Sequence, residues 1–142
     1  MSFEEIRVIT VVYLAVFLPL FIYFRNKSIL PNWIPSFYLV SVVICALGWE
    51  LWFTYGWIDG DSVDIRRSGA LNSWLPKNIN WLLNSMGDAG GVLLGGAWLM
   101  WASHKKDSTV FKKWKWSAFS VLMIWCIGQN ILVEMFLYHD QL

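Results

Sequence analysis

Four long runs of apolar residues, separated by polar connections, constrain the fold of this chain more than any other feature. They cover about residues 8–24, 37–57, 79–103 and 116–138. About 20 helical residues cross the hydrocarbon core of a bilayer, so each run is long enough to span it, the first only just. The runs are continuous rather than alternating, which argues against barrel strands. The sequence therefore predicts an all-α membrane protein, an antiparallel four-helix transmembrane bundle, with residues 1–142 as a single integral membrane domain.

Composition supports a membrane location. The chain is 57% hydrophobic and 15% charged, whereas soluble domains carry about 25% charged residues. Its 11 Trp and 9 Phe residues are typical of the aromatic belts at membrane interfaces. The first run follows Glu4 and Glu5 and has no small-residue cleavage motif, so we interpret it as a permanent span rather than a signal peptide. The lipid bilayer is the expected partner, nucleic acid is not expected, and no motif specifies a cofactor.

The basic residues predict the orientation of the spans. Most of the 11 Lys and Arg residues fall in the first and third connections, at Arg25, Lys27, Lys105, Lys106, Lys112, Lys113 and Lys115. The positive-inside rule places these connections in the cytoplasm. We therefore expect a multi-pass protein with both termini, and the long connection 58–78, on the non-cytoplasmic side.

Three carboxyl groups lie inside the predicted spans, at Glu50, Asp88 and Glu134. A helix rises about 1.5 Å per residue, which places them roughly 10, 13 and 6 Å from the outer ends of their helices, in one half of the bilayer. A charge at the bilayer centre costs at least about 2.5 kcal/mol, so we expect these groups to face the bundle interior and find partners. Burial favours the neutral form, so at least one is expected to hold a proton that it can donate or exchange.

Polar residues at four-residue spacing extend this cluster along shared helix faces. The sets are Asn80, Asn84 and Asp88, then Cys126, Asn130 and Glu134, then Glu50 and Thr54. We predict one outer-half site in which the catalytic residues are Glu50, Asp88 and Glu134. The predicted substrate-binding residues are Trp49, Thr54, Asn84, Gln129, Asn130, Arg66 and Arg67.

Several residues have two interpretations. Trp49 either packs plainly or lines a pocket and stacks on a cation. Arg66 and Arg67 either pair with neighbouring acids or receive a phosphate or other anion. The acids of the same connection do not follow the calcium-loop pattern, so no metal site is predicted. Cys45 and Cys126 fall within spans and are expected to be buried thiols rather than a redox pair.

Glycines mark the third span as the one that other helices approach. Gly87, Gly91 and Gly95 form two overlapping GxxxG patterns, which allow close helix contact in lipid. The glycines could allow helices to pack closely inside the bundle or across a homo-oligomer, and they could leave space for a ligand beside Asp88. These alternatives are compatible.

The pair Trp49–Glu50 inside a span resembles the membrane-integral terpene cyclases, in which a Trp-Glu pair sits on an early helix and a distant Asp completes acid catalysis. The resemblance covers these two residues and the general layout, and those enzymes have about twice as many spans. It implies acid chemistry at Glu50.

Three classes of function fit the sequence, and only the first could make the protein an enzyme. The first is a membrane enzyme or binding protein for an amphiphile, a lipid or isoprenoid that enters from the bilayer while Glu50 and Asp88 handle protons. The second is a small proton-coupled transporter, although no polar path reaches the cytoplasmic side. The third is an accessory subunit of a larger membrane complex, whose polar faces pair with a partner.

Overall fold

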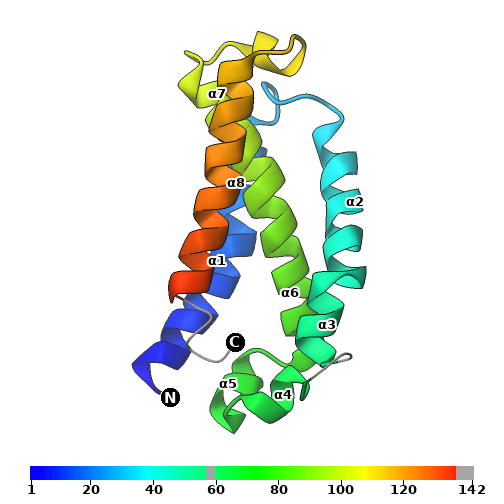
Figure 1. Cartoon of the computed structure of the whole chain (residues 1–142), viewed down its shortest axis with the longest axis vertical. Helices are drawn as coiled ribbons and strands as arrows, with labels where there is room; N and C mark the ends of the chain where they lie inside the picture. Colours follow the sequence, from blue (N-terminus) through cyan, green and yellow to red (C-terminus); the bar gives the residue numbers. More distant parts are fainter. Residues whose placement is uncertain (57–59, 137–142) are drawn as a thin grey trace.

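The computed structural model describes residues 1–56 and 60–136, without the side chains of Glu134 and Phe136. Every regular element in these ranges is helical. The long elements form rods that stand side by side and run alternately up and down (Figure 1). The rods are α1 (Phe3–Asn26), α2 (Ile34–Leu47) with α3 (Trp49–Tyr55), α6 (Lys77–Ala89) with η1 (Gly90–Gly95) and α7 (Gly96–Ser103), and α8 (Trp116–Phe136).

The first rod begins before the apolar run because its start is capped. The hydroxyl of Ser2 accepts from the backbone N–H of Glu5 at 3.2 Å, and the carboxylate of Glu5 accepts from the backbone N–H of Ser2 at 2.7 Å. This capping box satisfies two N–H groups that otherwise lack a helical partner. The helix therefore begins at Phe3 rather than near residue 8.

The second rod differs from the continuous helix predicted for 37–57, because it bends by 41° between α2 and α3. Gly48 occupies the bend, where a Cβ atom would lie 2.8 Å from the carbonyl oxygen of Ile44. Only glycine tolerates so close an approach to the preceding turn. The rod ends at Gly56, whose φ of 63° is left-handed, and Trp57 lies outside the described residues.

The third rod is continuous but contains a π-helical turn, η1. The indole N–H of Trp125 on α8 donates to the carbonyl oxygen of Gly91 at 2.7 Å. A Cβ on Gly87 would lie 3.1 Å from the Cβ of Ala15 on α1, and one on Gly95 would lie 3.4 Å from Trp125 Nε1. The predicted glycine seam therefore faces α1 and α8 of the same chain, and a homo-oligomer through it stays a prediction.

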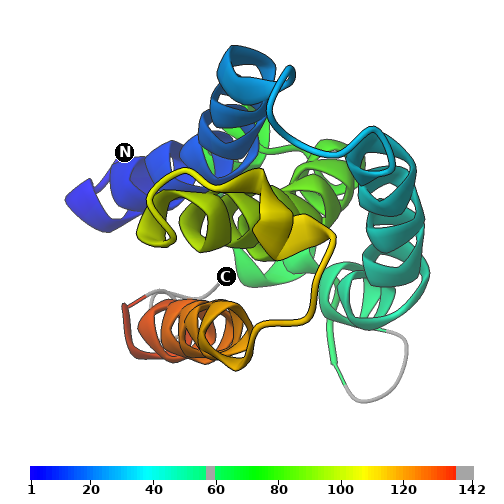
Figure 2. The same cartoon turned by 90° about the horizontal axis from the view of Figure 1, so that it is seen from above.

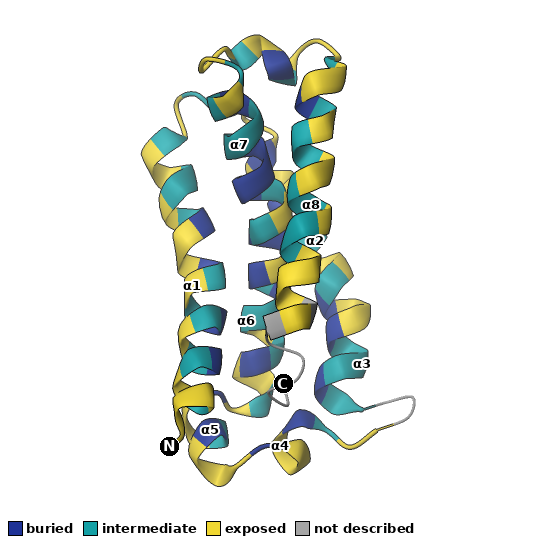
Figure 3. Cartoon of the chain, turned by 60° about the vertical axis from the view of Figure 1, so that its left-hand side comes forward, coloured by how far each residue is buried: buried dark blue, intermediate teal, exposed yellow. Residues whose placement is uncertain are grey.

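Two hydrophobic clusters close the ends of the bundle. The outer cluster joins α1 to the connection 60–76, which folds into α4 (Val63–Arg66) and α5 (Gly69–Trp74), and contains Val8, Val12, Leu71 and Leu75. The inner cluster joins α2 to the third rod, near the 3₁₀ turn η2 (Ser108–Phe111), and contains Leu30, Ile34, Tyr38, Ala89, Leu94 and Ala97. Figure 3 shows buried positions in dark blue along the rods, with exposed positions in yellow on the same rods.

The outer faces of the rods are apolar and exposed. In the described chain, α1 and α8 are long and apolar enough to cross a membrane, and the bent α2–α3 pair adds a third such element if it counts as one span. Only 22% of the most apolar stretch of α1 and 6% of that of α8 is buried in the bundle. Soluble monomers rarely expose large apolar surfaces. These helices indicate an integral membrane protein.

Candidate functional site

An open cavity lies between the two hydrophobic clusters. Its volume is about 600 Å³, within the roughly 300–1,000 Å³ range of small-molecule sites. Its walls come from α1, α2, α3, α6, η1 and α8 and are mostly apolar. In Figure 2, α8 stands apart from the α2–α3 rod, with no described helix between them on one side. The polar residues that line the cavity are Ser41, Cys45, Glu50, Asn84, Asp88, Gln129 and Asn130.

The bend at Gly48 places Glu50 in the cavity wall. Glu50 lies in the first turn of α3, which packs against α6, and its side chain is only 4% exposed. A straight helix would carry this turn away along the axis of α2. Gly48, two residues before Glu50, therefore positions this acid by allowing the bend.

Close packing of α1 against α6 positions the second acid. Gly87 fits against Ala15, which fixes the rotation of α6 about its axis. Asn84 and Asp88, one helical turn apart, then share the face that lines the cavity. Unlike Glu50, Asp88 is exposed, and the cavity is where it meets open space.

Glu50 and Asp88 form a pair, which we name the carboxyl pair. The side chain of Glu50 is within hydrogen-bonding reach of those of Asp88 and Asn84. Two ionised carboxylates in contact repel, which favours a form of such a pair that shares one proton. The Glu50 Oε2 atom is buried without a hydrogen-bond partner among the described residues.

The buried guanidinium of Arg67 supplies the opposite charge. Arg67 is 7% exposed, and its Nη1 donates to Asn80 Oδ1 at 2.9 Å. Burial lowers the pKa of Arg67 to about 10, which leaves the side chain cationic at neutral pH. Arg67 and Glu50 also interact electrostatically. Arg67 is thus a buried cation that interacts with the carboxyl pair.

The structure separates the two predicted anion-binding arginines. Arg67 points into the bundle, whereas Arg66 lies at the surface, donates from Nη2 to the carbonyl oxygen of Phe53 at 2.6 Å and stacks on that ring at 5.0 Å. Arg66 therefore closes the end of α3 and lies apart from the carboxyl pair. Thr54 is fully buried one turn beyond Glu50 and does not line the cavity.

The other predicted site residues lie around the cavity mouth. Trp49 lines the cavity and packs on Trp52, with ring centroids 4.5 Å apart. Gln129 and Asn130 reach the cavity from α8. Asn130 also donates to the carbonyl oxygen of its own helix at Cys126, at 2.7 Å. The side chain of Glu134 lies outside the described residues, so its predicted role stays a prediction.

Sequence reasoning missed Ser41 and Cys45 as lining residues. They lie four residues apart on α2, and both line the cavity. The same four-residue spacing that connected Glu50 with Thr54 could have found them. Both Cys45 and Cys126 are free thiols and half-buried rather than fully buried.

Among residues 1–56 and 60–136, no group of three or more His, Cys, Asp or Glu side chains is placed to hold a metal ion. Comparison of the chain with protein-family models, curated proteins and solved structures finds no match.

Proposed function

We propose that this chain is a multi-pass membrane protein that binds an amphiphile, a lipid or an isoprenoid, in the cavity and acts on its polar end by acid–base chemistry. The observation that carries this proposal is the carboxyl pair, held in the wall of a largely apolar cavity of about 600 Å³. An apolar chain fits the lining, and the carboxyl pair with the amides of Asn84, Gln129 and Asn130 fits a polar end group.

In this proposal each of the rods crosses the bilayer, which makes the fold an antiparallel four-helix transmembrane bundle. The exposed apolar faces of α1 and α8 support it. The lysines between residues 105 and 115 lie on the cytoplasmic side by the positive-inside rule. Both termini and the α4–α5 connection then lie on the non-cytoplasmic side.

The cavity is open and is lined by residues of both α8 and the α2–α3 rod, which favours access from the bilayer between these rods. α8 packs mainly on α7, near the inner end, and its lower half borders the cavity through Gln129, Asn130 and Val133. A ligand that entered between these rods would keep its apolar chain in lipid while its polar end reached Asp88.

The carboxyl pair supplies both an acid and a base. Its shared proton can move to a hydroxyl, carbonyl or amine of the bound end group, and the resulting carboxylate can take a proton back from the ligand. The proton count balances, since each transfer moves one proton between the pair and the ligand. This chemistry fits binding of the end group as well as its transformation.

The inner cluster favours this function over a proton-coupled transporter. Leu30, Ile34 and Leu94 are each at most 4% exposed and lie on the cytoplasmic side of the cavity. A transporter needs a polar path through that layer.

Binding of farnesol, an isoprenoid alcohol, tests the proposal. The reconstituted protein should bind it with saturable quenching of tryptophan fluorescence, because Trp49 lines the cavity. Asp88→Asn should weaken binding, whereas Asp61→Asn, at an exposed position outside the cavity, should not. Equal, non-saturable quenching in all three proteins would mean that farnesol merely dissolves in the bilayer and that the proposal is wrong for this ligand class.

A further inference from the structure

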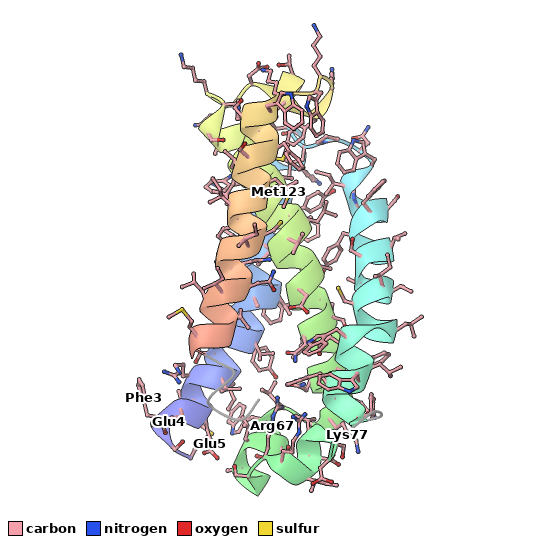
Figure 4. The ribbon with its side chains drawn as sticks, in the orientation of Figure 1. Phe3, Glu4, Glu5, Arg67, Lys77 and Met123 are labelled. Carbon is pink, nitrogen blue, oxygen red and sulfur yellow. The ribbon has the colours of Figure 1, made fainter. Side chains whose placement is uncertain are left out.

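A row of buried polar atoms that have no hydrogen-bond partner among the described residues lies on the outer side of the carboxyl pair. Arg67 is 7% exposed, Glu50 is 4% exposed, and Thr54 and Asn80 are fully buried. Within the part of the chain that the structure describes, no partner lies within hydrogen-bonding distance of Arg67 Nε and Nη2, Asn80 Nδ2, Thr54 Oγ1 or Glu50 Oε2. Figure 4 shows Arg67 at the end of the bundle that α4 and α5 close.

The antiparallel packing of α3 against α6 places these side chains in sequence. Glu50 lies within reach of Asn84, and the hydroxyl of Tyr55 donates to Asn78 Oδ1 at 2.8 Å. In this register Thr54, one turn after Glu50, lies opposite Asn80, one turn before Asn84, about 6 Å further toward the outer end.

Arg67 continues the row beyond Asn80. Its Nη1 donates to Asn80 Oδ1 at 2.9 Å, which leaves the amide nitrogen of Asn80 free to donate elsewhere. The row therefore runs from Arg67 in the outer connection, past Asn80 and Thr54, to Glu50.

These atoms do not satisfy one another, because none of them lies within hydrogen-bonding distance of another. The free atoms of Arg67 and Asn80 are all donors, and only Thr54 and Glu50 offer an acceptor. Each buried polar group that lacks a partner costs about 1–3 kcal/mol. Water accepts from these donors and donates to a carboxyl oxygen, so a few buried waters would satisfy the whole row.

We propose that Arg67, Asn80 and Thr54 bind a file of water that connects the outer solution with Glu50 and carries protons to the carboxyl pair. Each step passes one proton between neighbouring oxygens, so the net change is the transfer of one proton from the outer solution to the carboxylate. We name this file the water passage. It gives protons a route of their own, separate from the opening between α8 and the α2–α3 rod. The inference rests on the carboxyl pair of the proposed function.

Silver ion, which is small enough to follow water and reacts with thiols, tests the water passage directly. In a Cys45→Ser, Cys126→Ser background, Thr54→Cys should react with Ag⁺ in the native protein. Val8→Cys is the matched control, because Val8 is 1% exposed at the same end of the bundle but packs in the outer apolar cluster. Protection of the thiol from later alkylation under denaturing conditions reports the reaction. Equal protection at both positions would overturn the passage.

Hydrogen–deuterium exchange of the protonated carboxyl tests proton movement. Infrared spectroscopy follows the carbonyl stretch of the carboxyl pair after transfer to deuterium oxide. Thr54→Val keeps the side-chain shape and removes the hydroxyl, and it should slow this exchange by about tenfold or more, since exchange then requires local opening. Thr10→Val, on the exposed face of α1, is the control. An unchanged exchange rate in Thr54→Val would refute the proton route.

The two experiments separate this inference from the proposed function. If no protonated carboxyl is seen in the parent protein, the carboxyl pair fails and the silver reaction alone decides whether water reaches Thr54. If the carboxyl signal is present but Thr54→Cys does not react with Ag⁺, the pair stands and the water passage is wrong.

Discussion

Replacement of Gly87 by leucine should separate two rods of the bundle. Gly87 lies where α6 crosses α1, and a Cβ atom there would lie 3.1 Å from the Cβ of Ala15, 3.7 Å from its carbonyl carbon and 3.8 Å from its carbonyl oxygen. None of these atoms belongs to a flexible side chain that could rotate away. The backbone of α1 must therefore move outward to admit the new side chain.

The magnitude follows from two opposing effects. Overpacking of a close contact costs about 1–3 kcal/mol, and leucine adds three more carbons beyond Cβ, which favours the upper end of that range. Removal of a glycine from a helix returns about 0.5–1 kcal/mol, because the unfolded chain loses freedom. We expect Gly87→Leu to lower the free energy of unfolding by about 1–2 kcal/mol.

Gly128→Leu provides the matched control, because Gly128 lies in α8 and a Cβ atom there meets no atom of residues 1–56 or 60–136 within 4 Å. This variant keeps the favourable effect on the unfolded chain without overpacking, and should be as stable as the parent or more stable. Unfolding of detergent-solubilised protein by sodium dodecyl sulfate, followed by circular dichroism, measures all three. Equal stability of Gly87→Leu and Gly128→Leu would show that α1 and α6 do not pack as described.

Three further predictions concern α8, the inner connection and the topology. Trp125→Phe removes the hydrogen bond to the carbonyl oxygen of Gly91 and should lower the free energy of unfolding in detergent by about 0.5–1.5 kcal/mol. The side-chain hydrogen bond from Thr109 lowers the pKa of Asp107 from 3.8 to about 2. The ionised carboxylate therefore stabilises the folded form above pH 4, and this stabilisation is lost as the pH falls through about 2. In acid denaturation, Asp107→Ala should remove the loss of folding free energy that the parent shows over this pH range. A membrane-impermeant maleimide should label Ser108→Cys only from the cytoplasmic side, and labelling from outside alone would reverse the proposed orientation.

The rods could be predicted from the sequence because continuous apolar runs and helical periodicity are local properties. The bend was missed, since a single glycine inside an apolar helix is compatible with a straight rod. The contact that requires glycine, with the carbonyl oxygen of Ile44 one turn earlier, arises only where the helix bends. The π-helical turn was missed too; the carbonyl oxygen of Gly91 within it accepts a hydrogen bond from Trp125 on α8, a contact between distant residues that no local pattern indicates.

In the candidate site, too, some features could be predicted from the sequence and others could not. Glu50, Asp88 and Asn84 could be grouped in advance, because depth and helix face follow from residue spacing. Arg67 could be chosen as a polar residue but not placed. Its path into the bundle depends on how the connection 60–76 folds beneath the rods, and no periodic pattern describes that path.

The central claim is that Glu50 and Asp88 act as one unit with a shared proton. Infrared titration of the carboxyl stretch in the parent, Glu50→Gln and Asp88→Asn proteins tests it most directly, since the amide replacements keep the shape of each side chain. We predict one protonated carboxyl at neutral pH in the parent. In each variant the remaining acid should titrate at a different pH than it does in the parent, because the two groups are coupled. If both acids instead titrate near pH 4, as free carboxyls do, and neither variant affects the other acid, the carboxyl pair does not exist.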